Sequence, residues 1–215
     1  MEQRTRRILH TALNLFCDKG IEDTSIEEVA GKAGVGPATI YRYFETKAEL
    51  AISAGIAYWQ QISEKYIGAL SNPNYIKMNG YSQIHCIFQI IIQIFEQEFM
   101  FLKFLQEFDI FVRRYQIPKE RLTEYEECIL NLKPYVTNAL EKGIQDGTLD
   151  FTCTVEEVYF SVMHTLLSLM QKLSYNGQML SSDERIGLTL QVRITSDLLL
   201  KGLKKKQHRN EEKNE

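Results

Sequence analysis

Hydrophobic residues recur at helical spacing along almost the whole chain, and this periodicity limits the possible folds more than any other feature. Apolar residues fall three or four positions apart, and no run alternates between apolar and polar residues as a half-buried strand would. Only four prolines interrupt the 215 residues, and the Asn-Gly and Asp-Gly pairs lie between helical patterns. The sequence therefore predicts an all-α protein of about eight or nine helices with little or no sheet.

Composition and charge narrow the class of protein. Hydrophobic residues make up 44% and charged residues 25%, so a disordered or collagen-like chain is excluded. The net charge of −3 argues against binding to polyanions by bulk charge alone. We expect no membrane helix, because Gln, Glu and Lys interrupt the longest apolar stretch. We expect the protein to be cytoplasmic, because no signal-peptide pattern opens the chain. The four scattered cysteines form no CxxC pair and are expected to be reduced.

Turn residues divide the chain into predicted helices. These cover, by approximate residue numbers, 4–18, two short helices within 25–44, 46–70, 82–115 with one break, 118–142 with a kink or boundary at Pro134, 154–175 and 182–204. A connector is expected over residues 143–151. Residues 205–215 are charged and uncapped, and we expect them to be disordered.

The stretch TSIEEVAGKAGVGPATIYRYFETK, residues 24–47, carries the strongest functional signal. Ser25 followed by Glu28 is a capping box, which predicts that a short helix begins there. Gly34 can adopt the positive φ that a tight reversal between two helices requires. Pro37 suits the first position of a second short helix, PATIYRYF. The stretch therefore predicts a helix-turn-helix.

The second short helix has chemically different faces. A helical wheel turns Ile40 and Phe44 inward and Ala38 and Arg42 outward, with Thr39 and Tyr41 at the flanks of the outward face. Two turns are enough to place one face in a DNA major groove. Arginine can bond guanine, methyl groups can meet thymine, and hydroxyl groups can reach phosphates. Lys47 begins the following helix, whose N-terminus also favours a phosphate.

This segment resembles the TetR family of transcriptional repressors. The resemblance is strong over about residues 5–50, most specifically in TIYRYFETK, and extends to the rest of the chain only in architecture. It implies operator contacts, and together with the helical wheel it gives the predicted DNA-binding set: Ser25, Ala38, Thr39, Tyr41, Arg42, Tyr43 and Lys47. The chain departs from the family at two positions. It has Gly36 where the family commonly has Ser, and Pro37 where the family commonly has Lys, Arg or Gln. A bare helix-turn-helix also occurs in proteins that never bind DNA.

Aromatic residues are concentrated in the middle of the chain. Seven of the 11 phenylalanines lie between residues 88 and 111, several at helical spacing. Core packing accounts for most of them, but the resemblance implies an inducer pocket in this region, and apolar aromatic walls suit one. The predicted pocket residues are Phe88, Phe104, Phe108 and Tyr125, and the predicted effector is a small apolar or aromatic molecule of unknown identity.

The last two predicted helices each have a broad apolar face. One two-turn helix reads only a few base pairs, whereas a two-fold dimer doubles the contact and fixes the half-site spacing. The predicted homodimer interface consists of Tyr159, Val162, Leu166, Met170, Leu190, Ile194 and Leu198. The alternative is that these faces pack only within one chain.

These features together predict a ligand-responsive transcriptional regulator. Residues 1–47 would form a DNA-binding domain, residues 48–204 a helical effector-binding and dimerisation domain, and residues 205–215 a tail. As a repressor, the dimer would bind a palindromic operator in double-stranded DNA and release it when the effector binds. No catalytic motif, metal-ligand spacing or phosphate loop is present, so neither enzymatic activity nor a metal or cofactor is expected. The competing interpretation is a ligand-binding or adaptor protein that has lost sequence-specific DNA binding; an enzyme that uses the aromatic pocket is a weaker one.

Overall fold

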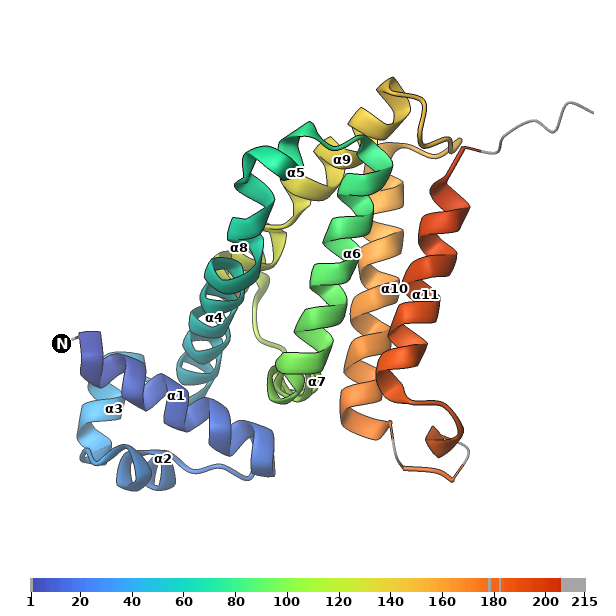
Figure 1. The fold of residues 1–215 in the computed structure, drawn as a ribbon. Coiled ribbons are helices and arrows are strands. Elements are labelled where there is room, and N and C mark those ends of the chain that lie inside the picture. Colours follow the sequence, from blue (N-terminus) through green and yellow to red (C-terminus); the bar gives the residue numbers. More distant parts are fainter. Residues whose placement is uncertain (1, 178, 182, 206–215) are drawn as a thin grey trace, which may run out of the picture.

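The computed structural model describes residues 2–177, 179–181 and 183–205, and the named elements in these residues are all helices (Figure 1). The described residues form eleven α-helices: α1 (Glu2–Lys19), α2 (Ile26–Ala33), α3 (Pro37–Phe44), α4 (Lys47–Tyr66), α5 (Pro73–Lys77), α6 (Gly80–Gln97), α7 (Phe99–Arg114), α8 (Thr123–Leu130), α9 (Lys133–Gln145), α10 (Val155–Asn176) and α11 (Leu188–Leu203). Three 3₁₀-helices join them: η1 (Ile67–Ser71), η2 (Lys119–Leu122) and η3 (Asp183–Arg185). The all-α class is confirmed, and the predicted count of eight or nine helices was too low.

Caps and prolines divide the predicted helices more finely than the hydrophobic pattern indicates. The long fourth helix ends at Tyr66, and α5 begins afresh at Pro73 because the Asn72 side chain accepts from two of the first amides of the new helix. Pro134 is a boundary, since it lies in the first turn of α9. The last helix begins at Leu188, after Gly187, and not at Ser182, which lies outside the described residues.

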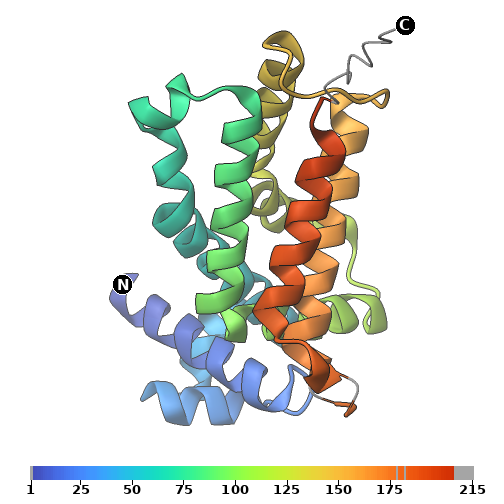
Figure 2. The same cartoon turned by 45° about the vertical axis from the view of Figure 1, so that its right-hand side comes forward.

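The first three helices, α1–α3, are called the head here, and the remaining helices are called the body. Figure 1 shows α4 running from the head into the body, where α6, α10 and α11 stand side by side; Figure 2 shows the same three helices from another direction. Helix α1 packs on α2, α4 and α7, so the head contacts the body through α7 as well as through α4. Displacement of either helix can therefore reach the head.

Helices α6 and α7 meet at a sharp bend of 88°, with Glu98 between them. No single helix in the described part of the chain is long and apolar enough to cross a membrane, and this bent pair passes that test only when its two helices are taken together, by length and composition alone. Many of their apolar side chains, including Phe88, Phe104 and Phe108, are buried within the chain itself, whereas Met100 and Ile110 of α7 are exposed.

The far end of the body is held by a close crossing of α6 and α9. A Cβ atom added to Gly80 would lie 2.1 Å from the backbone nitrogen of Gly143, so only glycine fits. Asp146 Oδ2 accepts from the Gly80 amide at 2.8 Å, and Thr148 Oγ1 accepts from the Tyr81 amide at 3.2 Å. The predicted connector over residues 143–151 therefore begins later, because α9 continues to Gln145, and it caps a helix that lies far away in the sequence.

The last described residues pack against the same connector. The Asp150 amide donates to the Leu203 carbonyl at 3.0 Å, and the Lys205 amide donates to the Thr148 carbonyl at 3.1 Å. Residues 206–215, most of the tail that we expect to be disordered, lie outside the described residues, and for them this stays a prediction.

Candidate nucleic-acid interface and aromatic core

Local caps form the two short helices of the head. Ser25 Oγ accepts from the Glu28 amide at 3.0 Å, and Gly34 adopts φ 63°, the left-handed conformation that ends α2. The predicted capping box is only half formed, because the Glu28 carboxylate turns to Lys19 Nζ at 2.6 Å. That hydrogen bond is the largest cause that lowers the pKa of Glu28.

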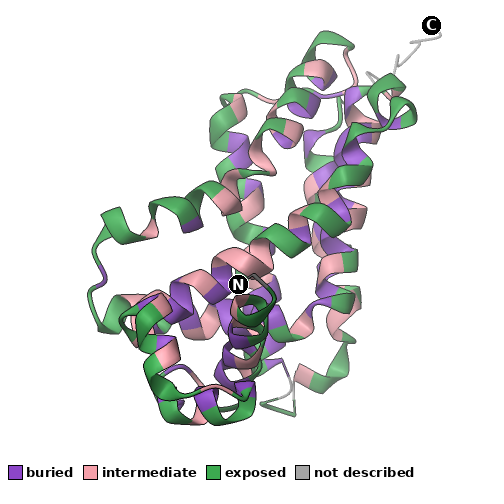
Figure 3. Cartoon of the chain, turned by 90° about the vertical axis from the view of Figure 1, so that its left-hand side faces the viewer, coloured by how far each residue is buried: buried purple, intermediate pink, exposed green. Residues whose placement is uncertain are grey.

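Helix α3 has the inward and outward faces that the wheel predicts. Ile40 is 1% and Phe44 7% exposed, whereas the Tyr41 side chain is 47% exposed and Ala38 and Arg42 are also exposed. The Arg42 guanidinium lies 5.2 Å from the centre of the Tyr43 ring, a cation–π distance that orients it. Figure 3 shows exposed residues along the outer edge of the head. The outward face of α3 is thus free to meet a partner.

Lys47 makes hydrogen bonds within the chain that the sequence does not predict. Its Nζ donates to the Glu22 carbonyl at 2.8 Å and to the Thr24 carbonyl at 3.2 Å, which ties the loop between α1 and α2 to the start of α4. Two of the three ammonium hydrogens are therefore engaged, and one is left for a phosphate. The contact joins residues more than 20 positions apart, so the local pattern could not indicate it.

Three of the four predicted pocket residues meet in the body. The Phe104 and Phe108 rings lie 5.6 Å apart, and the Phe108 and Tyr125 rings 4.7 Å apart, centre to centre. Phe104 also stacks on Phe16 of α1, at 6.4 Å. Phe88 is buried on α6, and among the described residues no ring contact joins it to this group. Phe104, Phe108 and Tyr125 are at most 7% exposed, so these rings are packed inside the body.

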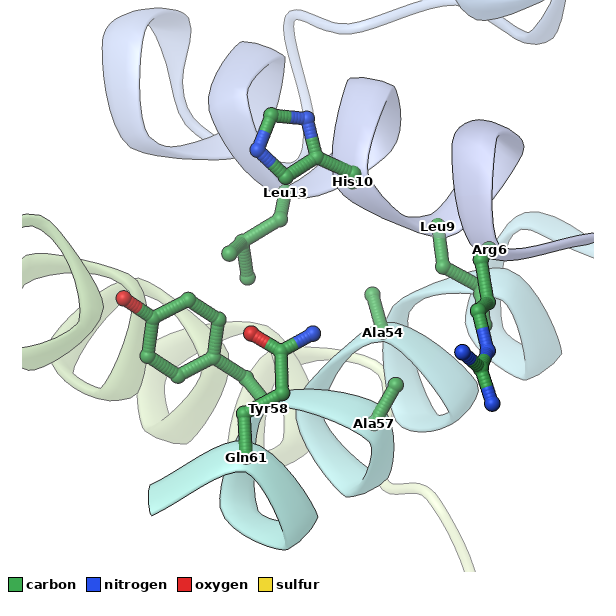
Figure 4. A pocket seen from close by; sticks show the side chains of 8 residues that line it. All are labelled: Arg6, Leu9, His10, Leu13, Ala54, Ala57, Tyr58 and Gln61. Atoms are coloured by element: carbon green, nitrogen blue, oxygen red, sulfur yellow. The ribbon is translucent and has the colours of Figure 1, made fainter. Parts of the chain in front are cut away.

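A small cavity of about 30 Å³ lies between α1 and α4, where the head meets the body (Figure 4). Leu9, Leu13, Ala54 and Ala57 give it apolar walls, and Arg6, His10, Tyr58 and Gln61 line it with polar groups. Its volume suits about one water molecule, whereas drug-sized sites measure roughly 300–1,000 Å³. None of the predicted pocket residues lines this cavity.

Glu98, at the bend between α6 and α7, is a site residue that the sequence analysis missed. Its carboxylate accepts from the Tyr58 hydroxyl at 2.5 Å, from Lys65 Nζ at 2.7 Å and from the Tyr66 hydroxyl at 2.8 Å, all on α4. Burial alone would raise the pKa of Glu98, but these three hydrogen bonds outweigh burial and hold the pKa below its ordinary value. An acidic residue at the break of an apolar helical pattern was the available signal.

The predicted dimer residues divide into two groups. Tyr159, Val162, Leu166 and Met170 are at most 7% exposed, because α10 packs against α7, α9 and α11 of its own chain. This part of the prediction needs correction, since side chains buried in their own core cannot meet a partner. By contrast, Leu190, Ile194 and Leu198 on α11 are 50%, 45% and 64% exposed.

The described part of the chain contains no group of three or more His, Cys, Asp or Glu side chains that could hold a metal ion. Besides the Lys47 hydrogen bonds, an ion pair joins the head to the body. Arg114 of α7 pairs with Glu22, which lies between α1 and α2. Within the body, Arg121 of η2 pairs with Glu49 in the first turn of α4. These side chains are more than a third exposed, so each pair orients more than it stabilises.

Comparison with known proteins places the head in a known group. Residues 8–54 match the model for bacterial regulatory proteins of the tetR family. The chain is 35% identical over 95 residues to the HTH-type transcriptional regulator AcrR of Shigella flexneri, covering 44% of this chain and 41% of that protein. It is 33% identical over 72 residues to the HTH-type transcriptional regulator YerO of Bacillus subtilis, covering 34% and 22%. These matches span less than half of either relative.

Solved structures are similar over nearly the whole chain. A regulatory protein of the tetR family from Rhodococcus has a TM-score of 0.70 at 14% identity, with 96% of this chain and all of that chain covered. The transcriptional regulator FadR from Bacillus subtilis, solved in complex with stearoyl-CoA, has a TM-score of 0.62 at 18% identity, with 92% and 98% covered. At these identities the likeness shows the fold, including the arrangement of the body helices.

Proposed function

The chain belongs to the TetR family of bacterial regulatory proteins, and on that premise we propose that it is a cytoplasmic repressor that binds a palindromic operator as a dimer and releases it when a small apolar or aromatic effector binds. The family is one of regulators and not of enzymes. The observation that carries the proposal is the exposed face of α3, which stands clear of the chain's other helices.

The outward face of α3 has the chemistry of a base-reading surface. Arg42 is exposed and held over the Tyr43 ring, so its guanidinium loses less freedom when it bonds the O6 and N7 of a guanine. Tyr41 offers an exposed hydroxyl group for a phosphate. Lys47 contributes first by fixing the loop before α2, and its remaining N–H supports one backbone contact.

The exposed stripe on α11 supports a homodimer. Leu190, Ile194 and Leu198 follow one another at four-residue steps on α11, and Ile186 continues this spacing just before the helix begins. Each is at least 45% exposed, and Phe160 on α10 is 36% exposed. A row of large apolar side chains in water favours burial against a second copy. Two heads held in this way would read half-sites separated by about 34–36 Å, one turn of DNA.

The effector proposal rests on the aromatic core. Phe104, Phe108 and Tyr125 provide apolar surface near both α4 and the head. A relative in fold, FadR from Bacillus subtilis, was solved with stearoyl-CoA, and another is named as a ketosteroid regulator from Mycobacterium tuberculosis. The stearoyl chain and the ketosteroid are both largely apolar. For this chain, an effector with an apolar body would open the packed rings and displace α4 or α7, changing the spacing of the two heads.

Selection of bound fragments from random DNA, followed by gel-shift titration, tests DNA binding. We expect an enriched palindrome, and we expect Arg42→Ala to weaken binding to it by about 1–3 kcal/mol with little effect on random DNA. Lys172→Ala, which removes an exposed cation on α10, is the control and should leave the affinity unchanged. If no fragment is enriched and the protein retards no DNA, the adaptor interpretation replaces this one.

A further inference from the structure

Tyr125 on α8 closes directly onto the backbone of α4 at Gly55. A Cβ atom added to Gly55 would lie 2.8 Å from Tyr125 Cε2 and 3.2 Å from Phe104 Cε1, so the ring occupies the place that a side chain would otherwise take. The Tyr125 side chain is only 7% exposed, and its ring lies 4.7 Å from that of Phe108. A ring-sized volume in the core is thus filled by the chain's own tyrosine.

Trp59 lies one turn after Gly55 on α4, and its indole N–H is buried without an acceptor. Burial raises the pKa of Tyr125, and the Trp59 indole N–H acts to lower it, so this N–H lies near the Tyr125 hydroxyl. The geometry between the two groups is nevertheless not that of a hydrogen bond. A buried donor without a partner destabilises the fold, because it has lost its hydrogen bond to water and gained none in return. Buried indole N–H groups usually have a partner, which makes Trp59 an exception that calls for an explanation.

We infer that the volume now filled by the Tyr125 ring, bounded by Gly55, Trp59, Phe104 and Phe108, is the effector site, and that its ligand is an aromatic or flat apolar molecule with one neutral hydrogen-bond acceptor that takes the Trp59 N–H. This inference rests on the proposed function, because it names the ligand class of the same regulator. The ligand replaces the Tyr125 ring, as an apolar body of similar size, and satisfies the indole N–H that Tyr125 leaves unpaired.

Charge near the site favours a neutral acceptor over an anionic one. The Asp109 carboxylate acts on Tyr125 so as to raise its pKa, which means that a second negative charge beside that ring is disfavoured. A carbonyl or ether oxygen meets the Trp59 N–H without this repulsion. The same site borders the head, because Phe104 stacks on Phe16 of α1 at 6.4 Å, so a ligand that separates these rings also moves α1.

Acetophenone and ethylbenzene form a matched pair of probes, since they share a ring with a two-carbon substituent and differ in one carbonyl oxygen. Trp59 is the single tryptophan of the chain, so its fluorescence reports binding at the site. We expect acetophenone to bind the wild-type protein about tenfold more tightly than ethylbenzene, the ratio for about 1.4 kcal/mol from pairing a buried donor. In Trp59→Phe, measured by calorimetry, the two affinities should become equal.

A second variant opens the site permanently. Tyr125→Ala should raise the affinity for both probes and keep the preference for acetophenone, because Trp59 remains. Tyr75→Ala is the matched control, since Tyr75 is another buried tyrosine, 8% exposed, whose hydroxyl lacks a partner, and it lies in α5 away from Trp59. Opening space there should give no preference for the ketone.

Three results overturn the inference: equal affinity of the wild-type protein for the two probes, a preference that survives in Trp59→Phe, or no binding of either probe to Tyr125→Ala. Operator binding, measured without any ligand, separates this inference from the proposed function. A protein that binds its operator and shows one of these three results refutes the effector site alone. A protein that prefers acetophenone through Trp59 but enriches no DNA refutes the regulator and keeps the site.

Discussion

Replacing Glu98 by alanine removes three hydrogen bonds that tie α4 to the bend between α6 and α7. The consequences for the three donors differ. Lys65 is 54% exposed and returns to water, and the Tyr66 hydroxyl keeps Gln97 as an acceptor at 2.9 Å. Only the half-buried Tyr58 hydroxyl loses its one acceptor. With about 1.5–3 kcal/mol for a hydrogen bond to a charged group and no simple additivity, we expect a loss of about 3 kcal/mol in the free energy of unfolding.

Urea unfolding followed by circular dichroism measures this loss. For a slope of about 1–3 kcal/mol per molar urea, Glu98→Ala should lower the midpoint by at least about 1 M. Lys65→Met is the matched control, because it removes only the exposed donor and should cost less than about 1 kcal/mol. A Glu98→Ala protein within about 1 kcal/mol of the wild type, or a Lys65→Met protein equally destabilised, would refute a buried carboxylate as the centre of this contact.

The pH dependence gives an independent check. Because the pKa of Glu98 in the folded chain lies below its ordinary value of 4.5, the ionised carboxylate stabilises the fold fully above the pKa of the unfolded chain. That contribution is lost as the pH falls through the lower pKa of the folded state. The stability difference between the wild-type protein and Glu98→Ala should therefore be constant near neutral pH and shrink below about pH 4.5. A difference that grows in acid would contradict the assignment.

Two further predictions concern helix packing and assembly. Gly80→Ala should destabilise the chain by about 3 kcal/mol or more in the same urea assay, because its Cβ would meet the Gly143 backbone. Gly31→Ala, with open space around its Cβ, should instead stabilise α2 by about 0.5–1 kcal/mol. Equal effects of the two substitutions would contradict the close crossing of α6 and α9. Ile194→Asp should turn a dimer into a monomer in sedimentation at micromolar concentration. Thr165→Asp, at an exposed polar position on α10, should not. A wild-type protein that sediments as a monomer would refute the proposed homodimer.

The head was largely predictable, because its structure is set by residues close together in the sequence. The N-cap at Ser25, the left-handed Gly34 and the two faces of α3 follow from local caps and helical spacing. Residues whose partners lie far away were missed or only partly understood. Lys47 pairs with carbonyls more than 20 residues earlier, and Glu98 pairs with side chains at least 32 residues earlier, so no local pattern contains either contact.

The face of α10 could not be chosen from its sequence. Apolar residues such as Val162 and Leu166 form one broad face of α10. A helical wheel does not show whether such a face packs against other helices of the same chain or against a second copy. In the structure α7, α9 and α11 cover that face. Helix α11 has a simpler pattern, because its opposite side, with Val192 and Leu200, is buried and leaves Leu190, Ile194 and Leu198 outward.

The cap on α6 also has a consequence for how the chain folds. The first amides of α6 find their acceptors on Asp146 and Thr148, about 66 residues further along, and Thr148 is in turn held by Lys205. During synthesis, the Gly80 and Tyr81 amides emerge from the ribosome bonded to water in place of these groups, whereas the Ser82 amide has a local acceptor in the Asn79 side chain. The body therefore closes as a cooperative unit only after its last helix is complete, which leaves the head, with its own local caps, free to fold first.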